Sequence, residues 1–123
     1  MTALLAPVVA ALSAGAVVDW LVAYAFTQAI EVPLYLRVAD GRWRVAVLAS
    51  TLTHPIVWFV FPAVCPLSWG YWGMVAAAEA FAVTAEAAWL RASGVGSALK
   101  WAALVNAASA TAGLLLRSAF GVP

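Results

Sequence analysis

Charge is scarce in this sequence, and that scarcity limits the classes of protein to which the chain can belong. Charged residues make up 9% of the 123 residues and hydrophobic residues make up 67%, whereas soluble domains carry about 25% charged and about 45–50% apolar residues. A soluble chain of this length leaves a large share of its surface in water and could not bury so many apolar side chains. The composition therefore excludes an ordinary soluble domain and predicts an integral membrane protein surrounded by the lipid bilayer.

Cysteine and histidine are also scarce, since Cys65 and His54 are the only residues of their kind. A lone cysteine excludes an internal disulfide and a cysteine-rich metal site. The net charge of +1 provides no basic surface for nucleic acid, so no such partner is expected. The nucleophile motif G-x-S-x-G, the zinc motif H-E-x-x-H and phosphate-binding loops are absent as well, so the sequence carries none of these catalytic signatures.

Long hydrophobic runs are what the sequence has in abundance. About 20 apolar residues in a helix cross the ~30 Å hydrocarbon core of a bilayer. Such runs cover residues 43–62, 71–90 and 98–116, and a fourth covers residues 17–36, with residues 3–16 as an interfacial or tilted extension of the same helix. The connecting segments are short, which makes successive helices antiparallel neighbours. We therefore predict one domain over residues 1–123, an all-α, integral membrane four-helix bundle with up-down topology.

The basic residues are unevenly distributed between the two ends of the predicted bundle. Five of them flank the first and third connections, namely Arg37, Arg42, Arg44, Arg91 and Lys100, and Arg117 alone lies at the other end. By the positive-inside rule, the end with more basic residues faces the cytoplasm, so both termini are expected outside the cytoplasm. The alanine-rich composition and the preference for arginine over lysine are typical of a GC-rich bacterium and indicate a bacterial inner membrane.

Four of the five acidic residues lie inside apolar runs, namely Asp19, Glu31, Glu79 and Glu86. An acid at the centre of a span costs about 2.5–3.5 kcal/mol on insertion scales. Long basic side chains can extend along a helix to reach the membrane interface, but short acidic side chains reach less far. We therefore expect the glutamates to face the interior of the bundle, whereas Asp19 lies near the outer interface.

Helical spacing places further polar side chains on the same interior faces. Residues three, four or seven apart share a face of a helix, which groups Gln28 with Glu31 and Glu79 with Glu86. At about 1.5 Å per residue from the nearest basic residues, most of these polar groups reach similar depths in the cytoplasmic half of the membrane. The predicted binding site comprises Glu31, His54, Glu79, Glu86 and Asn106, with Gln28, Thr51 and Ser109 as supporting polar residues.

A His-Pro pair interrupts the second apolar run, within the sequence LASTLTHPIVWFVFP of residues 48–62. Pro55 lacks the N–H that would bond to the carbonyl of Thr51, and its ring pushes this turn open. The hydroxyl groups of Ser50 and Thr51 and the neighbouring helices can satisfy the freed backbone groups. The pair therefore predicts a kinked helix whose wide turn faces polar neighbours, where the imidazole of His54 is tolerated.

A weak internal repeat relates the two halves of the chain. The sequence YLR at residues 35–37 matches WLR at residues 89–91, and each precedes a short loop and a helix with a buried polar residue. Two tandem helical hairpins in parallel orientation, related by a pseudo-twofold axis along the membrane normal, would give this pattern.

Three functions are open for the predicted polar site. The first is a small accessory or binding subunit that holds a cation, a cofactor or a lipid head-group, or that docks to a larger membrane complex. The second is a proton-coupled carrier of a small molecule or ion that acts as a homodimer. The third is an intramembrane enzyme that uses a divalent metal, with His54, Glu31 and Glu86 as ligands, because imidazole and carboxylate suit zinc, iron and manganese.

A purely structural role competes with these functions. In that role a protonated glutamate bonds to His54 or Asn106 and fixes the packing of the helices. Such bonds contribute only ~0.6 kcal/mol on average between membrane helices, which is small beside the insertion cost of several acids. The sequence therefore favours a binding subunit over a structural role and over an enzyme.

Overall fold

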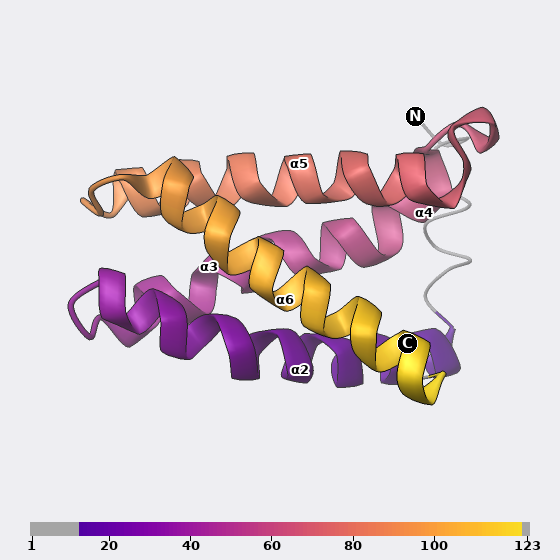
Figure 1. Cartoon of the computed structure of the whole chain (residues 1–123), viewed down its shortest axis with the longest axis horizontal. Helices are drawn as coiled ribbons and strands as arrows, with labels where there is room; N and C mark the ends of the chain where they lie inside the picture. The colour runs from indigo at the N-terminus through magenta and orange to yellow at the C-terminus, as the bar shows by residue number, and fades with distance from the viewer. Residues whose placement is uncertain (1–12, 122–123) are drawn as a thin grey trace.

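The structure, a computed structural model, describes residues 13–121. It contains four long helical segments that run back and forth (Figure 1). They are α2 (Ala14–Val38), a segment composed of α3 (Trp43–Pro55), the π-helix η1 (Ile56–Val60) and α4 (Phe61–Val64), then α5 (Gly70–Ala92) and α6 (Ala98–Phe120), with the short 3-10 helix η2 (Leu67–Trp69) before α5. All four segments are long and apolar enough to cross a membrane. The predicted all-α four-helix bundle with up-down topology is confirmed.

Each helical segment is longer than the span predicted for it. The first helix begins at Ala14, where the Ser13 hydroxyl accepts a hydrogen bond from the backbone N–H of Ala16 at 3.2 Å. This contact caps the helix by satisfying one of its free N–H groups. Residues 14–16 of the predicted extension therefore continue the first span as part of α2, and residues 3–12 lie outside the part of the chain that the structure describes.

Two short loops lie together at one end of the bundle, which we call the closed end (Figure 1). They are residues 39–42, between α2 and α3, and residues 93–97, between α5 and α6. Gly41 and Gly94 have φ values of +75° and +82°, in the left-handed region that favours glycine. Each glycine thus allows a helix to end and the chain to reverse within a few residues.

Small buried side chains bring the helices close together at the closed end. The hydrophobic core consists of Tyr35, Ala39, Ala46, Ala49, Ala87, Leu90, Val95, Ala98, Ala102 and Val105. Most of these residues are alanines, which allow helix backbones to approach closely within a membrane. The guanidinium Nη1 of Arg42 also donates to the carbonyl of Ser93 at 2.6 Å and joins the two loops.

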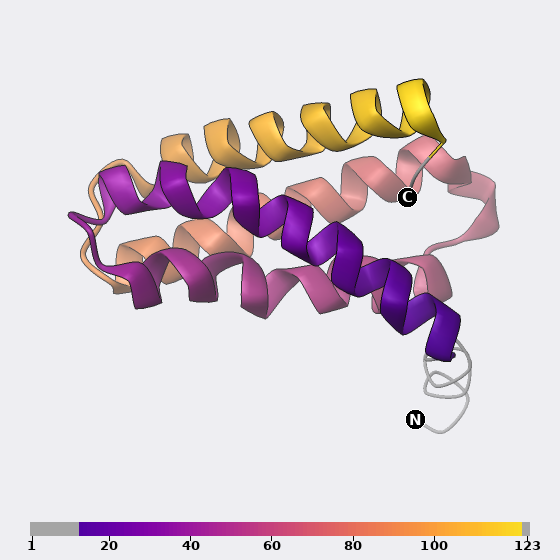
Figure 2. The same cartoon turned by 90° about the horizontal axis from the view of Figure 1, so that it is seen from below.

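The helices separate away from the closed end. α2 packs against α3 and α6, and α5 packs against the same two helices. α6 diverges from α5 in Figure 1, and it diverges from α2 in the perpendicular view of Figure 2. The bundle is therefore tightly packed at one end and wider toward the other.

The second span changes its hydrogen-bonding pattern at Pro55, as the sequence predicts. α3 ends at this proline, and the next residues, Ile56–Val60, form a turn of π-helix before α4. The missing N–H of Pro55 leaves the carbonyl four residues earlier without its usual partner. π-Helical turns are rare and occur frequently at functional sites.

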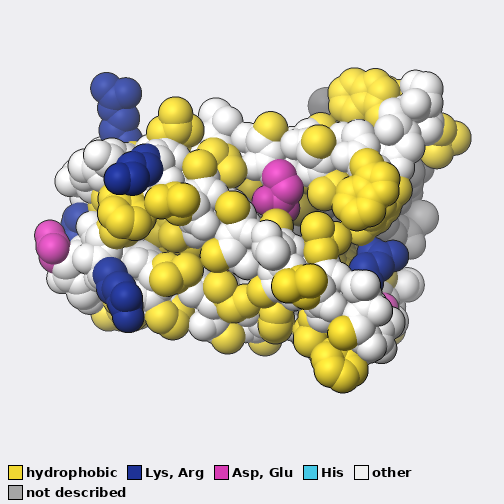
Figure 3. Space-filling model, in the orientation of Figure 1, with side chains coloured by type: hydrophobic (Ala, Val, Ile, Leu, Met, Phe, Trp, Pro, Cys, Tyr) yellow, Lys and Arg dark blue, Asp and Glu magenta, His cyan; other side chains and the backbone are white. Residues whose placement is uncertain are grey.

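The basic side chains gather at the closed end (Figure 3). The five residues predicted to flank the two loops do so, and Arg117 lies near the opposite end of α6. That the closed end faces the cytoplasm remains a prediction. The internal repeat also remains a prediction. Its two aromatic residues make different contacts, since Tyr35 donates to Glu86 and Trp89 donates to the carbonyl of Val45 at 2.9 Å.

Candidate functional site

Glu86 lies where side chains from all four helical segments meet. This residue, on α5, is 1% exposed. It accepts hydrogen bonds from the hydroxyl of Tyr35 on α2 at 2.5 Å, the hydroxyl of Thr53 on α3 at 2.7 Å and the side-chain amide of Asn106 on α6 at 2.7 Å. Hydrogen bonds to a charged group are stronger than neutral ones, so an ionised Glu86 would hold the four helices in register.

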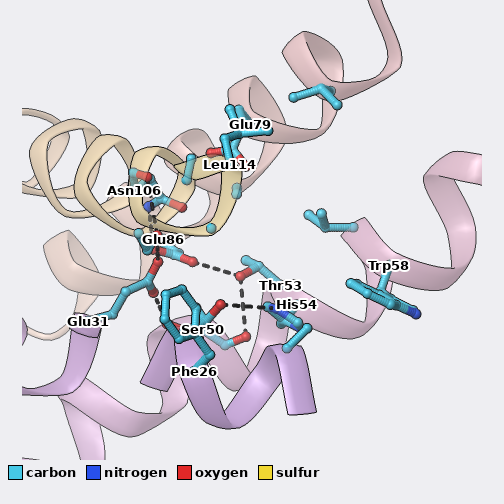
Figure 4. A pocket seen from close by; sticks show the side chains of 18 of the residues that line it. Phe26, Glu31, Ser50, Thr53, His54, Trp58, Glu79, Glu86, Asn106 and Leu114 are labelled. Atoms are coloured by element: carbon cyan, nitrogen blue, oxygen red, sulfur yellow. Dashed lines mark hydrogen bonds between the residues drawn. The ribbon is translucent and has the colours of Figure 1, made fainter. Parts of the chain in front are cut away.

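Glu31, on α2, is the second buried acid of this region and is also 1% exposed. It accepts hydrogen bonds from the hydroxyl groups of Ser50 on α3 and Ser109 on α6. Figure 4 shows Glu31 and Glu86 close to Ser50 and Asn106 at the centre of the bundle. We call Glu31 and Glu86 the acid pair.

The acid pair is solvated by neutral groups. Its five hydrogen-bond donors are four hydroxyls and one amide. Within residues 13–121, no arginine or lysine donates a hydrogen bond to either carboxylate. The two acids therefore bring carboxyl groups together without a positively charged partner from the described chain.

A second hydrogen-bonded group surrounds His54. The indole N–H of Trp20 donates to Nδ1 of His54 at 2.9 Å, and Nε2 of His54 lies 3.3 Å from the hydroxyl of Thr27. Since Nδ1 accepts, the proton of a neutral imidazole is assigned to Nε2, which then donates to Thr27. The Trp58 ring stacks on the imidazole with a centroid distance of 6.2 Å. His54 is thus held by aromatic and hydroxyl groups and not by the acid pair.

The predicted supporting residues Gln28 and Thr51 belong to a third contact, between α2 and α3. The amide of Gln28 donates to the hydroxyls of Tyr24 at 2.6 Å and Thr51 at 3.0 Å. The hydroxyl of Thr51 also donates to the carbonyl of Val47 at 2.7 Å. These bonds join α2 to α3, and the side-chain oxygen of Gln28 is buried without a hydrogen-bond partner in the described part of the chain. Gln28 and Thr51 therefore support the helix pair and not the acids.

The structure does not assemble the three metal ligands that the sequence suggests. Within residues 13–121, no three side chains of His, Cys, Asp or Glu lie close enough together to hold a metal ion. Glu31 and Glu86 share one region, but both imidazole nitrogens of His54 contact Trp20 and Thr27.

A cavity of about 230 Å³ extends from the acid pair toward the wider part of the bundle. We call it the inner cavity. Its lining includes Glu31, Ser50, His54, Trp58, Glu79, Glu86, Asn106, Ser109, Tyr71 and Arg117, together with smaller apolar residues. At the far end Arg117 lies over the ring of Tyr71, 5.2 Å from its centroid, and donates to its hydroxyl at 3.0 Å. The cavity thus has an acidic base, mostly apolar walls and a positive charge at its far end.

Models of protein families, curated proteins and solved structures offer no match to this chain. The geometry of the inner cavity is therefore the basis for inferring a function.

The structure brings together Glu31, Glu86, Asn106 and Ser109 among the predicted site residues, and it places Glu79 farther along the same cavity. Sequence reasoning did not select Tyr35 or Thr53, both of which donate to Glu86. Each carried a signal. Tyr35 lies four residues after Glu31 and Thr53 lies three after Ser50, so both share a helix face with a polar residue.

Proposed function

We propose that this four-span protein is a membrane-embedded binding subunit that holds a positively charged group against Glu31 and Glu86. The observation that carries the proposal is a pair of buried carboxylates at the base of a cavity, whose hydrogen-bond donors within residues 13–121 are all neutral. A charge inside a membrane protein is costly unless it is paired. A bound cation would supply the missing partner.

The unused hydrogen-bonding capacity of the acid pair fits a primary ammonium group. An ionised carboxylate has about four lone-pair sites, so two carboxylates can accept about eight hydrogen bonds. The acid pair accepts five from the described part of the chain. The remainder is about three, which equals the three N–H donors of an ammonium group.

The size of the inner cavity also fits a head-group. Its volume of about 230 Å³ is roughly seven or eight times the ~30 Å³ that a water molecule occupies in the liquid. Sites for drug-sized ligands typically have volumes of about 300–1,000 Å³. The cavity therefore suits an ammonium or guanidinium group with a few attached carbons.

The test uses a dodecylamine that carries bromine on its chain, a quencher of tryptophan fluorescence, with the protein in lipid nanodiscs. The bromine-labelled dodecanol of equal length is the neutral control probe. We expect saturable quenching by the amine and only non-saturable quenching by the alcohol. E31Q and E86Q should each weaken amine binding by about tenfold or more, which is ~1.4 kcal/mol.

The matched control variant is D19N, which removes an acid from α2 at an exposed position outside the cavity lining. It should bind the amine as the wild-type protein does. Equal saturable quenching in wild type and in the double variant E31Q/E86Q, with both proteins folded by circular dichroism, would refute the proposal.

A proton-coupled carrier acting as a homodimer is the second candidate. It is favoured by the fact that alanine packing closes one end of the bundle while the inner cavity extends toward the other, as in one state of an alternating-access carrier. In proteoliposomes, a carrier predicts that the bromine-free dodecylamine drives proton movement, measured with a pH-sensitive dye, and that E31Q abolishes it. Amine binding without proton movement would support the binding subunit and refute the carrier.

A further inference from the structure

A second hollow lies on the outside of the bundle, between α5 and α6. It has a volume of about 490 Å³, and we call it the α5–α6 groove. It is lined by Glu79, Ala80, Val83, Thr84, Ala103, Asn106, Ala107, Ala110, Thr111 and Leu114. Most of these side chains are small, so the groove leaves space for a narrow chain between the two helices.

The α5–α6 groove and the inner cavity meet along a shared wall. Glu79, Asn106, Ala110 and Leu114 line both. Asn106 is also one of the donors to Glu86. Figure 4 shows Glu79 on α5 and Leu114 on α6 bordering the cavity. Only the side chains of two helices therefore separate the lipid-facing groove from the acid pair.

Glu79 differs from the acid pair in its surroundings. Five hydrogen bonds reach Glu31 and Glu86, whereas none from the described part of the chain reaches the carboxylate of Glu79. Glu79 is only partly buried, and Figure 3 shows an acidic side chain in the middle of the mainly apolar face formed by α5 and α6. An acid at this position attracts a cation that is already dissolved in the membrane.

The far end of the inner cavity offers a less favourable route for a cation. The guanidinium of Arg117 lies there against Tyr71. Two like charges about 4 Å apart repel by ~1 kcal/mol in water and by more where the dielectric constant is lower. A cation that passes between α5 and α6 meets Glu79 instead.

From this geometry we infer that the ligand is a lipid-soluble primary amine, which enters sideways from the bilayer between α5 and α6. Its ammonium group passes Glu79 to reach the acid pair, and its alkyl chain lies in the α5–α6 groove. The inference rests on the proposed function, because it assumes that the acid pair binds a cation.

The test compares two tryptophan substitutions on α6. Ala107 and Ala108 are both exposed, but only Ala107 lines the groove, and neither lines the inner cavity. A107W therefore obstructs the groove from the lipid side without touching the acid pair. A108W adds the same side chain, and the same fluorophore, one position away.

The bromine-labelled dodecylamine is mixed with the proteins in lipid vesicles, and quenching is followed by stopped flow. A107W should slow association by about tenfold, because the added side chain obstructs the path between α5 and α6. It should also weaken binding at equilibrium, because the alkyl chain lies in the same groove. A108W should bind at the wild-type rate. E79Q should associate more slowly than wild type.

The outcomes separate this inference from the proposed function. If the wild-type protein shows no saturable binding that E86Q weakens, the proposed function fails. If such binding is present but A107W and A108W bind equally fast, the sideways route is overturned and the proposed function stands. Faster binding in R117Q with no effect of A107W would show entry from water and also overturn the route. A change of oligomeric mass in A107W with unchanged rates would show that the groove is a contact between copies, and this too overturns it.

Discussion

Removal of one hydroxyl tests whether the hydrogen bond between Tyr35 and Glu86 holds the bundle together. Tyr35 is fully buried, and its hydroxyl donates to Glu86 at 2.5 Å. Tyr35→Phe deletes this donor and leaves the ring in place. Hydrogen bonds to charged groups contribute about 1.5–3 kcal/mol in soluble proteins, whereas bonds between membrane helices average ~0.6 and reach ~1.7 kcal/mol. Because Thr53 and Asn106 still bond to Glu86, we expect a loss of about 1–1.5 kcal/mol in the free energy of unfolding.

Reversible unfolding in mixed detergent micelles, followed by circular dichroism, measures this loss. Tyr71→Phe is the matched control, because Tyr71 is exposed and bonds to Arg117 near the other end of the bundle. Its effect should be within about 0.5 kcal/mol of zero. A double-mutant cycle of Y35F with E86Q should give a coupling energy of about 1 kcal/mol. Equal losses in Y35F and Y71F, or an additive cycle, would refute the interpretation that the bond between Tyr35 and Glu86 stabilises the bundle.

Three further predictions concern other parts of the molecule. Ala102 has no exposed surface at the closed end, so A102L should destabilise the bundle by about 1–3 kcal/mol through overpacking. Ala103, the next residue, is exposed, so A103L should change the free energy of unfolding by less than about 0.5 kcal/mol. Similar effects of the two substitutions would contradict the tight packing. Trp20→Phe removes the donor to Nδ1 of His54, and nitrogen NMR of the imidazole should then show a mixture of the two neutral tautomers in place of one. No hydrogen bond from the described part of the chain reaches the carboxylate of Glu79. E79Q should therefore slow amine association and lower the free energy of unfolding by no more than about 0.5 kcal/mol. A larger loss of stability would show that Glu79 has a structural role.

The helices and the general location of the polar residues could be predicted from the sequence. Long apolar runs define spans because every backbone polar group must be satisfied within the membrane. The interior position of Glu31 and Glu86 followed from the cost of exposing an acid to lipid. Pro55 predicted a disturbed turn because proline lacks an N–H, and the π-helical turn follows it.

The partners of the polar residues could not be predicted in the same way. Periodicity shows which residues share a face, but the rotation of each helix about its axis decides which residue on the facing helix they meet. Ser50 and His54 are one turn apart on α3, yet Ser50 reaches Glu31 while His54 reaches Trp20. Thr53 was overlooked because a threonine in an apolar run often bonds to its own backbone, and here it also reaches Glu86.

The divergence of the helices could not be predicted from the sequence either. Alanines are spread along α5 and α6, so composition alone does not show where two helices approach closely. Contacts of the buried alanines Ala46, Ala98 and Ala102 concentrate at the closed end. The inner cavity follows from this uneven packing.

The hydrogen bond between Arg42 and the carbonyl of Ser93 restrains the closed end when the helices tilt apart. Because this bond joins the two loops, a helix that tilts moves least at the closed end and most at its opposite end. A helix of 23 residues such as α6 is roughly 35 Å long at 1.5 Å per residue, so a tilt of about 5° displaces its free tip by about 3 Å and its midpoint by half as much. Thermal bending would thus widen the far end of the inner cavity near Tyr71 more than its base at the acid pair. Amines with different tails could therefore bind with the same geometry at the carboxylates.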